Sequence, residues 1–236
     1  MEPFSLSSLG LSIFPEFVTH EEEKILEEEV LQQFGDKPFE QGHWDNAISR
    51  YRELQVPQHS FSPTLQKIYS RALPFLLAYS PSPQPVHLIE YQKGYKLFPH
   101  IDSSYAGDCI LGISLLSPCV MVYRHQPNQP NNQPTSSPQG SGGAATVQRR
   151  ESKEGGSCLR ALLPPRSLYR CTGEIRSNWT HEINAEPKEK DEKEEGTWFN
   201  GKFITGPDKR ISIILRGKPR EEDLPPPPPF PPFLPR

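Results

Sequence analysis

Short strand-like runs separated by turn residues dominate the chain from Val86 onward, and no other feature constrains the fold as strongly. The runs are either continuously apolar or alternate apolar with polar residues, which is the pattern of strands buried on one or both faces. They cover residues 86–91, 109–115, 120–123, 159–163, 168–171, 179–183 and 210–216. A succession of this kind predicts a sandwich or a jelly roll.

Two helices are predicted before these strands. Thr19, followed three residues later by Glu22, forms a capping box ahead of apolar residues at helical spacing, which predicts a helix of roughly 15 residues that ends at Gly35. A second helix is expected to begin near Thr64 and to bend or stop at Pro74. The polar stretch between them is expected to be a loop with a short helical turn. Two helices followed by about eight short strands predict a mainly β protein with N-terminal helices and a double-stranded β-helix, or jelly-roll, core.

A single domain over residues 1–217 is expected to hold the core. The hydrophobic content is only 34% and the chain has 28 prolines, so part of its length is expected not to pack. Residues 125–158, rich in Pro, Gln, Asn, Ser and Gly, predict a disordered insertion, and the charged run 186–195 predicts a solvated loop. Residues 218–236, which end in a proline- and phenylalanine-rich tract, predict a disordered tail of polyproline II form.

Charge and cysteine content indicate which binding partners and which cellular compartment to expect. The net charge is −3, and residues 1–54 carry twelve acidic against four basic side chains, unlike the basic surfaces that bind nucleic-acid backbones. The four cysteines show no Cys-x-x-Cys spacing, which predicts reduced thiols in the cytoplasm or nucleus. Neither a membrane span nor a cleaved mitochondrial presequence is expected, because no apolar run is long enough and the first fifteen residues lack Lys and Arg.

A candidate metal site is formed by His100 and Asp102 together with His181. On a strand, residues two apart point to the same side, so His100 and Asp102 would present an imidazole and a carboxylate to one point. His181, from a distant strand, would complete a two-histidine, one-carboxylate set, which leaves iron positions open for a co-substrate and oxygen. The alternative for His100 is a strand-end histidine that bonds a backbone carbonyl. A second His-x-Asp triplet, at His43 and Asp45, lies in a polar stretch and is interpreted as structural or substrate-facing.

A candidate anion site lies on the last strand-like run. The buried-type segment from Arg210 to Arg216 turns Arg210, Ser212, Ile214 and Arg216 to one face. An arginine that points into a barrel needs an anion, and a dicarboxylate such as 2-oxoglutarate would satisfy it through a bidentate pair. The alternative is a pair of exposed charges at the two ends of a strand.

The order and spacing of these residues resemble a known family. Tyr91, the His100-x-Asp102 pair, His181, and two arginines six residues apart resemble the AlkB group of iron(II)- and 2-oxoglutarate-dependent dioxygenases. Within that group the resemblance is to the mitochondrial, necrosis-linked branch of the seventh AlkB homologue, and it covers residues ~11–217 without the insertion. The motifs that carry it are Gly42-His43-Trp44-Asp45-x-Ala47-Ile48, Pro99-His100-x-Asp102-Ser103, Leu115-Leu116-Ser117-Pro118, Ser167-Leu168-Tyr169, His181-Glu182-Ile183 and Lys209-Arg210-Ile211-Ser212.

The resemblance implies roles for the site residues. His100, Asp102 and His181 would bind Fe(II), and Arg210 would bind the distal carboxylate of 2-oxoglutarate. Tyr91 would hydrogen-bond the co-substrate, and Arg216 would lie near its other end. Ser212 is a further candidate contact of the co-substrate. AlkB itself has asparagines at two positions where this chain has Ser212 and Ile89, which lies two residues before Tyr91. The implied reaction uses O2 and hydroxylates or oxidatively demethylates a substrate, with release of succinate and CO2.

Three hypotheses about the target remain open. The acidic N-terminal segment favours a protein or small-molecule substrate over the alkylated DNA or RNA of most AlkB relatives. A third hypothesis is a non-catalytic jelly-roll adaptor, in which the tract Pro225–Phe233 recruits domains with an aromatic groove. The protein is expected to be an intracellular monomer, and the family resemblance adds the mitochondrion to the candidate compartments.

Overall fold

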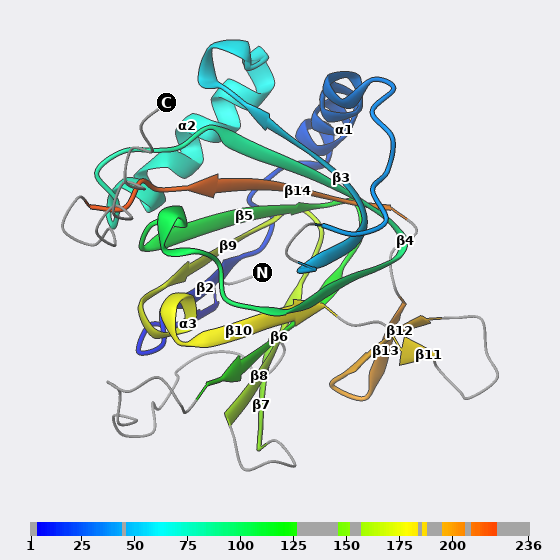
Figure 1. Cartoon of the computed structure of the whole chain (residues 1–236), viewed down its shortest axis with the longest axis vertical. Helices are drawn as coiled ribbons and strands as arrows, with labels where there is room; N and C mark the ends of the chain where they lie inside the picture. Colours follow the sequence, from blue (N-terminus) through cyan, green and yellow to red (C-terminus); the bar gives the residue numbers. More distant parts are fainter. Residues whose placement is uncertain are drawn as a thin grey trace, which may run out of the picture.

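An eleven-stranded antiparallel sheet, strongly curled on itself, organises the molecule (Figure 1). The computed structural model describes residues 4–43, 46–126, 146–151, 157–183, 186–187, 195–205 and 209–220. The strands of the large sheet are β1 (Phe4–Leu6), β2 (Leu11–Phe14), β3 (Ile48–Val56), β4 (Val86–His100), β5 (Cys109–Leu115), β6 (Cys119–His125), β7 (Val147–Glu151), β8 (Ser157–Leu163), β9 (Ser167–Thr172), β10 (Trp179–Ile183) and β14 (Lys209–Arg216). A smaller sheet holds β11 (Glu186–Pro187), β12 (Glu195–Phe199) and β13 (Lys202–Thr205).

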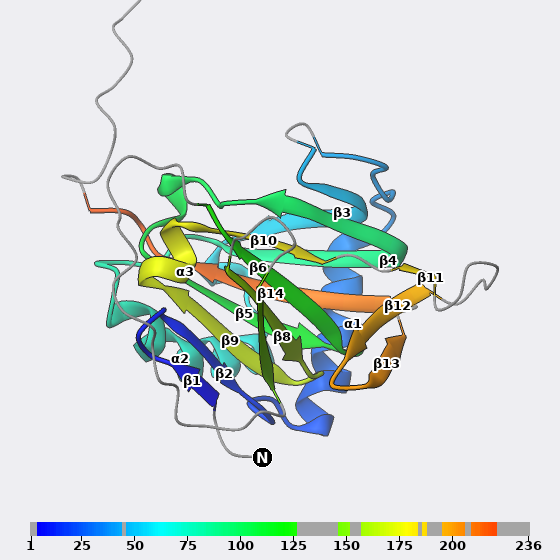
Figure 2. The same cartoon turned by 90° about the horizontal axis from the view of Figure 1, so that it is seen from below.

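The strand order is β1-β2-β9-β5-β14-β4-β10-β6-β8-β7, and β3 pairs with β4 beside this path. The long strand β4 connects the two halves of the curl. Its first half pairs with β14, where Tyr91 lies opposite Arg210, and its last residues pair with β10, where His100 lies opposite His181. Figure 2, seen from below, shows β6 and β8 beyond β10, and β7 pairs with β8 at the end of the sheet.

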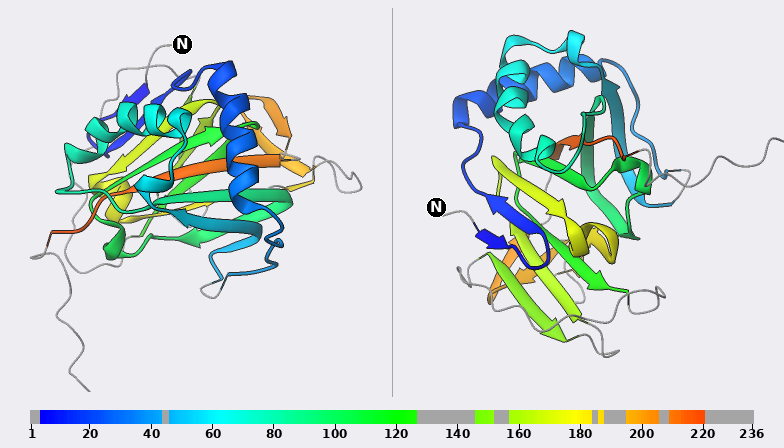
Figure 3. Two further views of the ribbon diagram at one scale, coloured as in Figure 1. Left: turned by 90° about the horizontal axis from the view of Figure 1, so that it is seen from above. Right: turned by 90° about the vertical axis from the view of Figure 1, so that its left-hand side faces the viewer.

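Two helices cover one face of the sheet: α1 (His20–Phe34) and α2 (Pro63–Leu77), seen from above in Figure 3. Helix α1 begins at the predicted capping box, in which Thr19 Oγ1 accepts from the Glu22 amide at 3.1 Å and Glu22 Oε2 accepts from the Thr19 amide at 3.0 Å. It ends at Gly35, as predicted. Helix α2 begins at the Ser62 cap and continues three residues past Pro74, although this proline removes one hydrogen bond from the ladder.

Alternation along β14 separates two cores. Ile211, Ile213 and Leu215 point outward and pack in one cluster with the helices, with alternate residues of β5 and with Leu88. Their neighbours, including Arg210, Ser212 and Ile214, face the inside of the curl, which holds the second core of the sheet. The inward face is therefore a partly polar chamber with apolar walls. The prediction of a mainly β fold with helices near the N-terminus is confirmed.

Several strands lie where none was predicted, so the expectation that both helices precede every strand is wrong. Strands β1 and β2 form a hairpin before α1, and β3 occupies the stretch expected to be a loop. The alternation that would have revealed β3 is broken at Arg50, which adopts φ 54° where the pairing register with β4 shifts.

The disordered insertion predicted at 125–158 includes residues that belong to strands, so its bounds are wrong. His125 ends β6, residues 147–151 form β7 at the edge of the sheet, and β8 begins at Ser157. In the described part of the sheet β7 is the outermost strand and pairs with β8. Residues 127–145 and 152–156 lie outside the described part.

The prediction of a loop over 186–195 is wrong at both ends, because the first residues form β11 and the last residue begins β12, and these two strands pair. Its residues 188–194, like 221–236 of the predicted tail, lie outside the described residues. Three further short elements complete the fold: the helix α3 (Gly173–Ser177) and the single 3-10 turns η1 (Gln58–Ser60) and η2 (Ser104–Ala106). Among the described residues, no helix has the length and apolarity needed to cross a membrane.

Candidate active site

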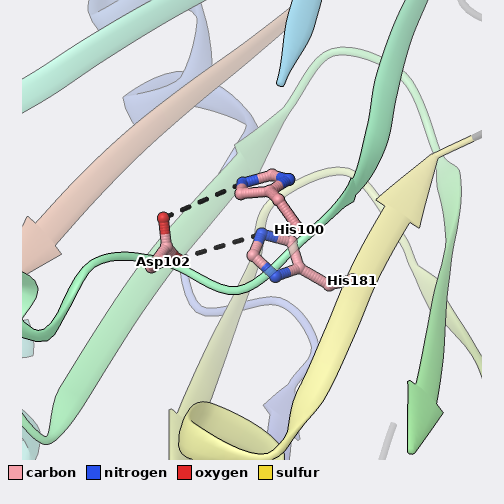
Figure 4. A group of neighbouring side chains, drawn as sticks. All are labelled: His100, Asp102 and His181. Carbon is pink, nitrogen blue, oxygen red and sulfur yellow. Dashed lines mark ion pairs between the residues drawn. The ribbon is translucent and has the colours of Figure 1, made fainter. Parts of the chain in front are cut away.

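Three potential metal ligands meet where β4 and β10 pair (Figure 4). His100 Nε2 lies 3.9 Å from Asp102 Oδ1, and His181 Nε2 lies 3.8 Å from Asp102 Oδ2. The three donor atoms all lie within 4.8 Å of one another, close enough to bind one ion. The structure thus brings together the residues that the sequence singled out. The expectation that His100 and Asp102 share a strand is wrong, because β4 ends at His100 and Asp102 lies in the loop that follows.

The protonation states of these side chains suit metal binding. The Nδ1 atom of His100 lies 2.7 Å from the carbonyl oxygen of Phe98. A carbonyl can only accept, so Nδ1 donates to it, and Nε2 is the ring nitrogen left to bind a metal. The histidine therefore bonds a backbone carbonyl and remains available as a ligand. Burial lowers the pKa of His181 to about 4, which keeps this imidazole neutral near pH 7.

Asp102 is held in its ionised form. Burial alone would raise the pKa of this carboxyl group, but the nearby His181 and Arg216 hold it below its usual value. Two imidazoles and one carboxylate form a ligand set suited to Fe(II), with coordination positions left for other molecules. The donor set therefore fits the ion that the sequence predicted.

Arg210 supplies a buried positive charge on the same side of the sheet. Arg210 is only 1% exposed, and its guanidinium lies 4.8 Å from the centre of the Tyr91 ring. The Nε atom donates to Ser114 Oγ at 3.3 Å. The Nη1 and Nη2 atoms are buried and have no hydrogen-bond partner among the described residues. A buried cation with two unpaired donor atoms is costly unless an anion joins it.

The residues around Arg210 extend this set of unpaired polar groups. The hydroxyls of Tyr95 and Ser212 are buried and lack a hydrogen-bond partner in the described part of the chain. Burial raises the pKa of Tyr95 and of the Cys119 thiol, so both stay neutral and neither offers a countercharge. We call Tyr91, Tyr95, Arg210 and Ser212 the anion cradle. Its donors fit a carboxylate, which supports 2-oxoglutarate as the ligand.

A cavity of about 460 Å³ connects two residues of the cradle, Tyr91 and Arg210, to the metal ligands. Its lining includes Arg210 and Tyr91 at one place and His100, Asp102 and His181 at another. Apolar side chains, among them Ile89, Ile110, Met121 and Ile214, form much of the remaining wall. A small dicarboxylate bound through one end to the cradle would therefore share its space with a metal ion.

Tyr95 and Tyr169 were missed by the sequence reasoning. Tyr95 lies four residues after Tyr91 in β4, but the pairing of β4 with β3 is irregular between them, so regular alternation gave no signal. Tyr169 lines the cavity because β5 has a glycine opposite it: a Cβ at Gly112 would lie 2.1 Å from the Tyr169 ring. That cross-strand relation is not visible in either segment alone.

Arg216 is held in place by contacts with Asp102 and His87. Its Nη2 lies 3.8 Å from Asp102 Oδ1, and its Nη1 donates to His87 Nδ1 at 2.9 Å. Because arginine can only donate, His87 Nδ1 must accept, and its Nε2–H donates to Glu53 Oε2 at 2.8 Å. Burial alone would raise the pKa of Glu53, but His87 keeps it below its usual value.

The second oxygen of Glu53 lies 3.4 Å from His43 Nε2. His43 therefore sits on the wall of the cavity, as do Glu53 and His87. Its neighbours Trp44 and Asp45 lie outside the described residues, so the interpretation of this triplet as structural or substrate-facing stays a prediction. The ion-pair distances place His43 with Glu53 and apart from the three potential metal ligands.

Comparisons with known proteins agree on one group. No protein-family model matches the chain. The mouse (Mus musculus) "alpha-ketoglutarate-dependent dioxygenase alkB homolog 7, mitochondrial" is 30% identical over 226 residues, which span 91% of this chain and 84% of that protein. An Arabidopsis thaliana "alkylated DNA repair protein ALKBH8 homolog" is 28% identical over 88% of this chain and 58% of that protein. The solved structure of OsALKBH1 aligns with a TM-score of 0.51 at 13% identity, over 88% of this chain and 96% of that chain. The predicted jelly-roll core is confirmed by the curled sheet and this match.

Proposed function

Because this chain belongs to the AlkB-like family of iron(II)- and 2-oxoglutarate-dependent dioxygenases, we propose that His100, Asp102 and His181 bind its iron and that Arg210 binds its co-substrate. Enzymes of this family use Fe(II), 2-oxoglutarate and O2 and release succinate and CO2. One observation supports the assignment above all others. A buried guanidinium with unpaired donor atoms lies on the same cavity as the three potential metal ligands.

Each residue of the site has a role in binding or orientation. Arg210 would bind the distal carboxylate in bidentate fashion, and Tyr91, Tyr95 and Ser212 would donate to the same group. Arg216, held by His87, would stay near Asp102 and the metal-proximal end of the co-substrate. The apolar wall would exclude water from the reacting atoms. When bound, iron and 2-oxoglutarate supply the oxidising power that the side chains lack.

We further propose that the substrate is a protein or a small molecule that carries no phosphate. Among the residues that the structure describes, the cavity lining contains no lysine, and its two arginines are assigned to the co-substrate and to the pairing with His87. Glu53, whose pKa is lowered, adds a negative charge to the wall. Phosphate groups bind where cations are available, so these charges disfavour a nucleotide. The alternative, an alkylated nucleic acid, is kept because the Arabidopsis relative is named as a DNA repair protein.

The other expectations are carried forward as proposals. Residues 1–217 would form one dioxygenase domain, with residues 218–236 as a tail outside it. A tail that recruits a partner remains compatible with catalysis, whereas a purely non-catalytic adaptor does not fit a member of this enzyme family. The cytoplasm, the nucleus and, from the name of the mouse relative, the mitochondrion are the compartments to test by cell fractionation.

Two assays test these assignments. The first is succinate release from 2-oxoglutarate with added Fe(II), together with calorimetric binding of 2-oxoglutarate in the presence of Mn(II), for the wild type, His100→Ala and Arg210→Ala. Both variants should lose turnover, and only Arg210→Ala should keep metal binding. Arg124→Ala is the control, because Arg124 pairs with Glu182 and is half exposed. If Arg210→Ala binds 2-oxoglutarate as tightly as the wild type does, the assignment of Arg210 to the co-substrate is wrong.

The second assay is binding to methylated oligonucleotides at about 50 mM salt, where attraction to phosphate is strong. No detectable affinity is expected. Tight binding whose affinity falls steeply with added salt would favour the nucleic-acid alternative.

A further inference from the structure

The loop that carries Asp102 has no strand to hold it. Strand β4 ends at His100, and the chain then passes through residues 101–103 and η2 before β5 begins at Cys109. Carboxylate ligands bind a metal tightly only if their direction is fixed before binding. Some other group must therefore fix this loop relative to His181.

Arg176 is positioned to do this. It lies in α3, five residues before His181, and α3 leads directly into β10 (Figure 1). The side chain of Arg176 reaches from this segment to the Asp102 loop and bonds three of its backbone carbonyls. Nη1 donates to the carbonyl of Asp102 itself at 3.0 Å, Nη2 to that of Ser103 at 2.6 Å, and Nε to that of Gly107 at 3.0 Å.

The geometry requires an arginine. The residue is 8% exposed, and its planar group presents donors in a fixed fork that meets three carbonyls at once. A lysine has the charge but only one nitrogen atom, which cannot reach the three positions together. No ion pair within 4.0 Å of an acidic side chain is found for Arg176 in the described residues, so its hydrogen bonds are made to backbone carbonyls rather than to a carboxylate.

We propose that Arg176 is a positioning residue of the metal centre, which joins the segment carrying His181 to the loop carrying Asp102. This inference rests on the proposed function, since it takes His100, Asp102 and His181 as the metal ligands. Its hydrogen bonds go to the backbone of the loop, so it acts on the metal ligands through the loop and not as a ligand itself. It sets the direction of the Asp102 carboxylate in the metal-free protein and so lowers the ordering required when the ion binds.

The test is titration with Co(II), a probe whose visible absorption reports coordination geometry. Arg176→Met, which matches the side-chain length but removes the donors, should weaken Co(II) binding roughly 10- to 100-fold and change the absorption spectrum of the bound ion. Arg176→Lys should be nearly as weak, because charge without the fork does not hold the loop. The matched control is Arg170→Met, since Arg170 is also partly buried and its guanidinium, which bonds Ser12 Oγ, lies over Tyr79, away from the metal ligands.

Chemical rescue separates positioning from general loss of stability. In Arg176→Ala, millimolar guanidinium should restore Co(II) affinity, and methylammonium at the same concentration should not. The inference is overturned if Arg176→Met or Arg176→Lys binds Co(II) within about twofold of the wild type, or if Arg170→Met weakens binding equally. If Arg176→Met does not fold, Arg176→Lys and the rescue of Arg176→Ala decide the outcome.

The proposed function has its own readout in the same experiment. If His100→Ala binds Co(II) as tightly as the wild type, the ligand assignment itself fails. If His100→Ala loses binding and Arg176→Met does not, only the positioning role fails.

Discussion

Replacing Arg210 with methionine should stabilise the ligand-free protein while abolishing its response to 2-oxoglutarate. In the ligand-free state Arg210 is 1% exposed, and its Nη1 and Nη2 atoms have no partner among the described residues. Its neighbours Tyr95 and Cys119 are neutral because burial raises the pKa of each. The described residues therefore give this buried cation no countercharge. Methionine has nearly the same length and no charge, so the substitution removes this cost with little loss of packing.

The size of the effect follows from buried charges in other proteins. Exchanging buried ionic groups for apolar residues of similar volume stabilises proteins by about 1–4 kcal/mol. A gain of about 2 kcal/mol corresponds to a rise in Tm of about 4–8 °C in a domain of this size. The ligand has the opposite effect. At a hundred times Kd it stabilises the wild type by about 2.7 kcal/mol. Loss of the buried carboxylate–arginine pair costs about 3 kcal/mol, which weakens binding more than a hundredfold.

Differential scanning calorimetry with and without 2-oxoglutarate, in the presence of Mn(II), measures both effects. The wild type should show the lower Tm without ligand and the larger upward shift with it, and Arg210→Met should show the reverse. Arg124→Met, in which a half-exposed arginine that pairs with Glu182 is changed, should alter neither the sign nor the size of the ligand shift. A ligand-free Arg210→Met protein that melts below the wild type, or one that keeps the full ligand shift, would refute the reasoning.

Three further predictions concern the scaffold. The contact with Arg71, with smaller effects from the Thr19 amide and Lys67, lowers the pKa of Glu22 to about 2, below its unfolded value of 4.5; this contribution to stability is therefore complete above pH 4.5 and is lost as the pH falls toward 2. Urea unfolding should show a shallower loss of stability over that range in Glu22→Gln than in the wild type. Gly112→Ala should cost about 1–3 kcal/mol and weaken 2-oxoglutarate binding, because its Cβ would lie 2.1 Å from the Tyr169 ring; the double variant with Tyr169→Leu should recover part of the stability in the same urea assay. Gly94→Ala should cost about 1–2 kcal/mol, because Gly94 adopts φ 74°, and an unchanged unfolding midpoint would show that β4 does not need this conformation.

The sequence was sufficient for residues whose chemistry and local pattern agree. Strand-like runs located β5, β9, β10 and β14, and an arginine placed on the inward face of β14 already required an anion. Strand β3 escaped because the bulge at Arg50 breaks the alternation on which strand prediction depends.

Arg176 escaped for a different reason. In the segment Gly173–Ser177 it resembles any charged helix residue, and its three partners lie about 70 positions earlier in the chain. Local patterns reveal which face of an element is apolar, but they do not reveal which polar group lies across from it. Residues that bind a ligand were therefore easier to predict than residues that hold the binding residues in place.

The irregular course of β4 explains how the anion cradle and the metal ligands can share one cavity. Tyr91 and His100 are nine residues apart, and a regular strand would separate them by about 30 Å, much longer than a five-carbon dicarboxylate. The pairing of β4 with β3 shows how this length is taken up. Tyr91 pairs with Tyr51 and Lys96 with Ser49, so residues 92–95 lie opposite the single residue Arg50. A bulge of this kind bends a strand, and with it the first half of β4 pairs with β14 while its end pairs with β10. Tyr91 and His100, nine residues apart, can therefore line the same cavity only because the bulge bends β4 between them.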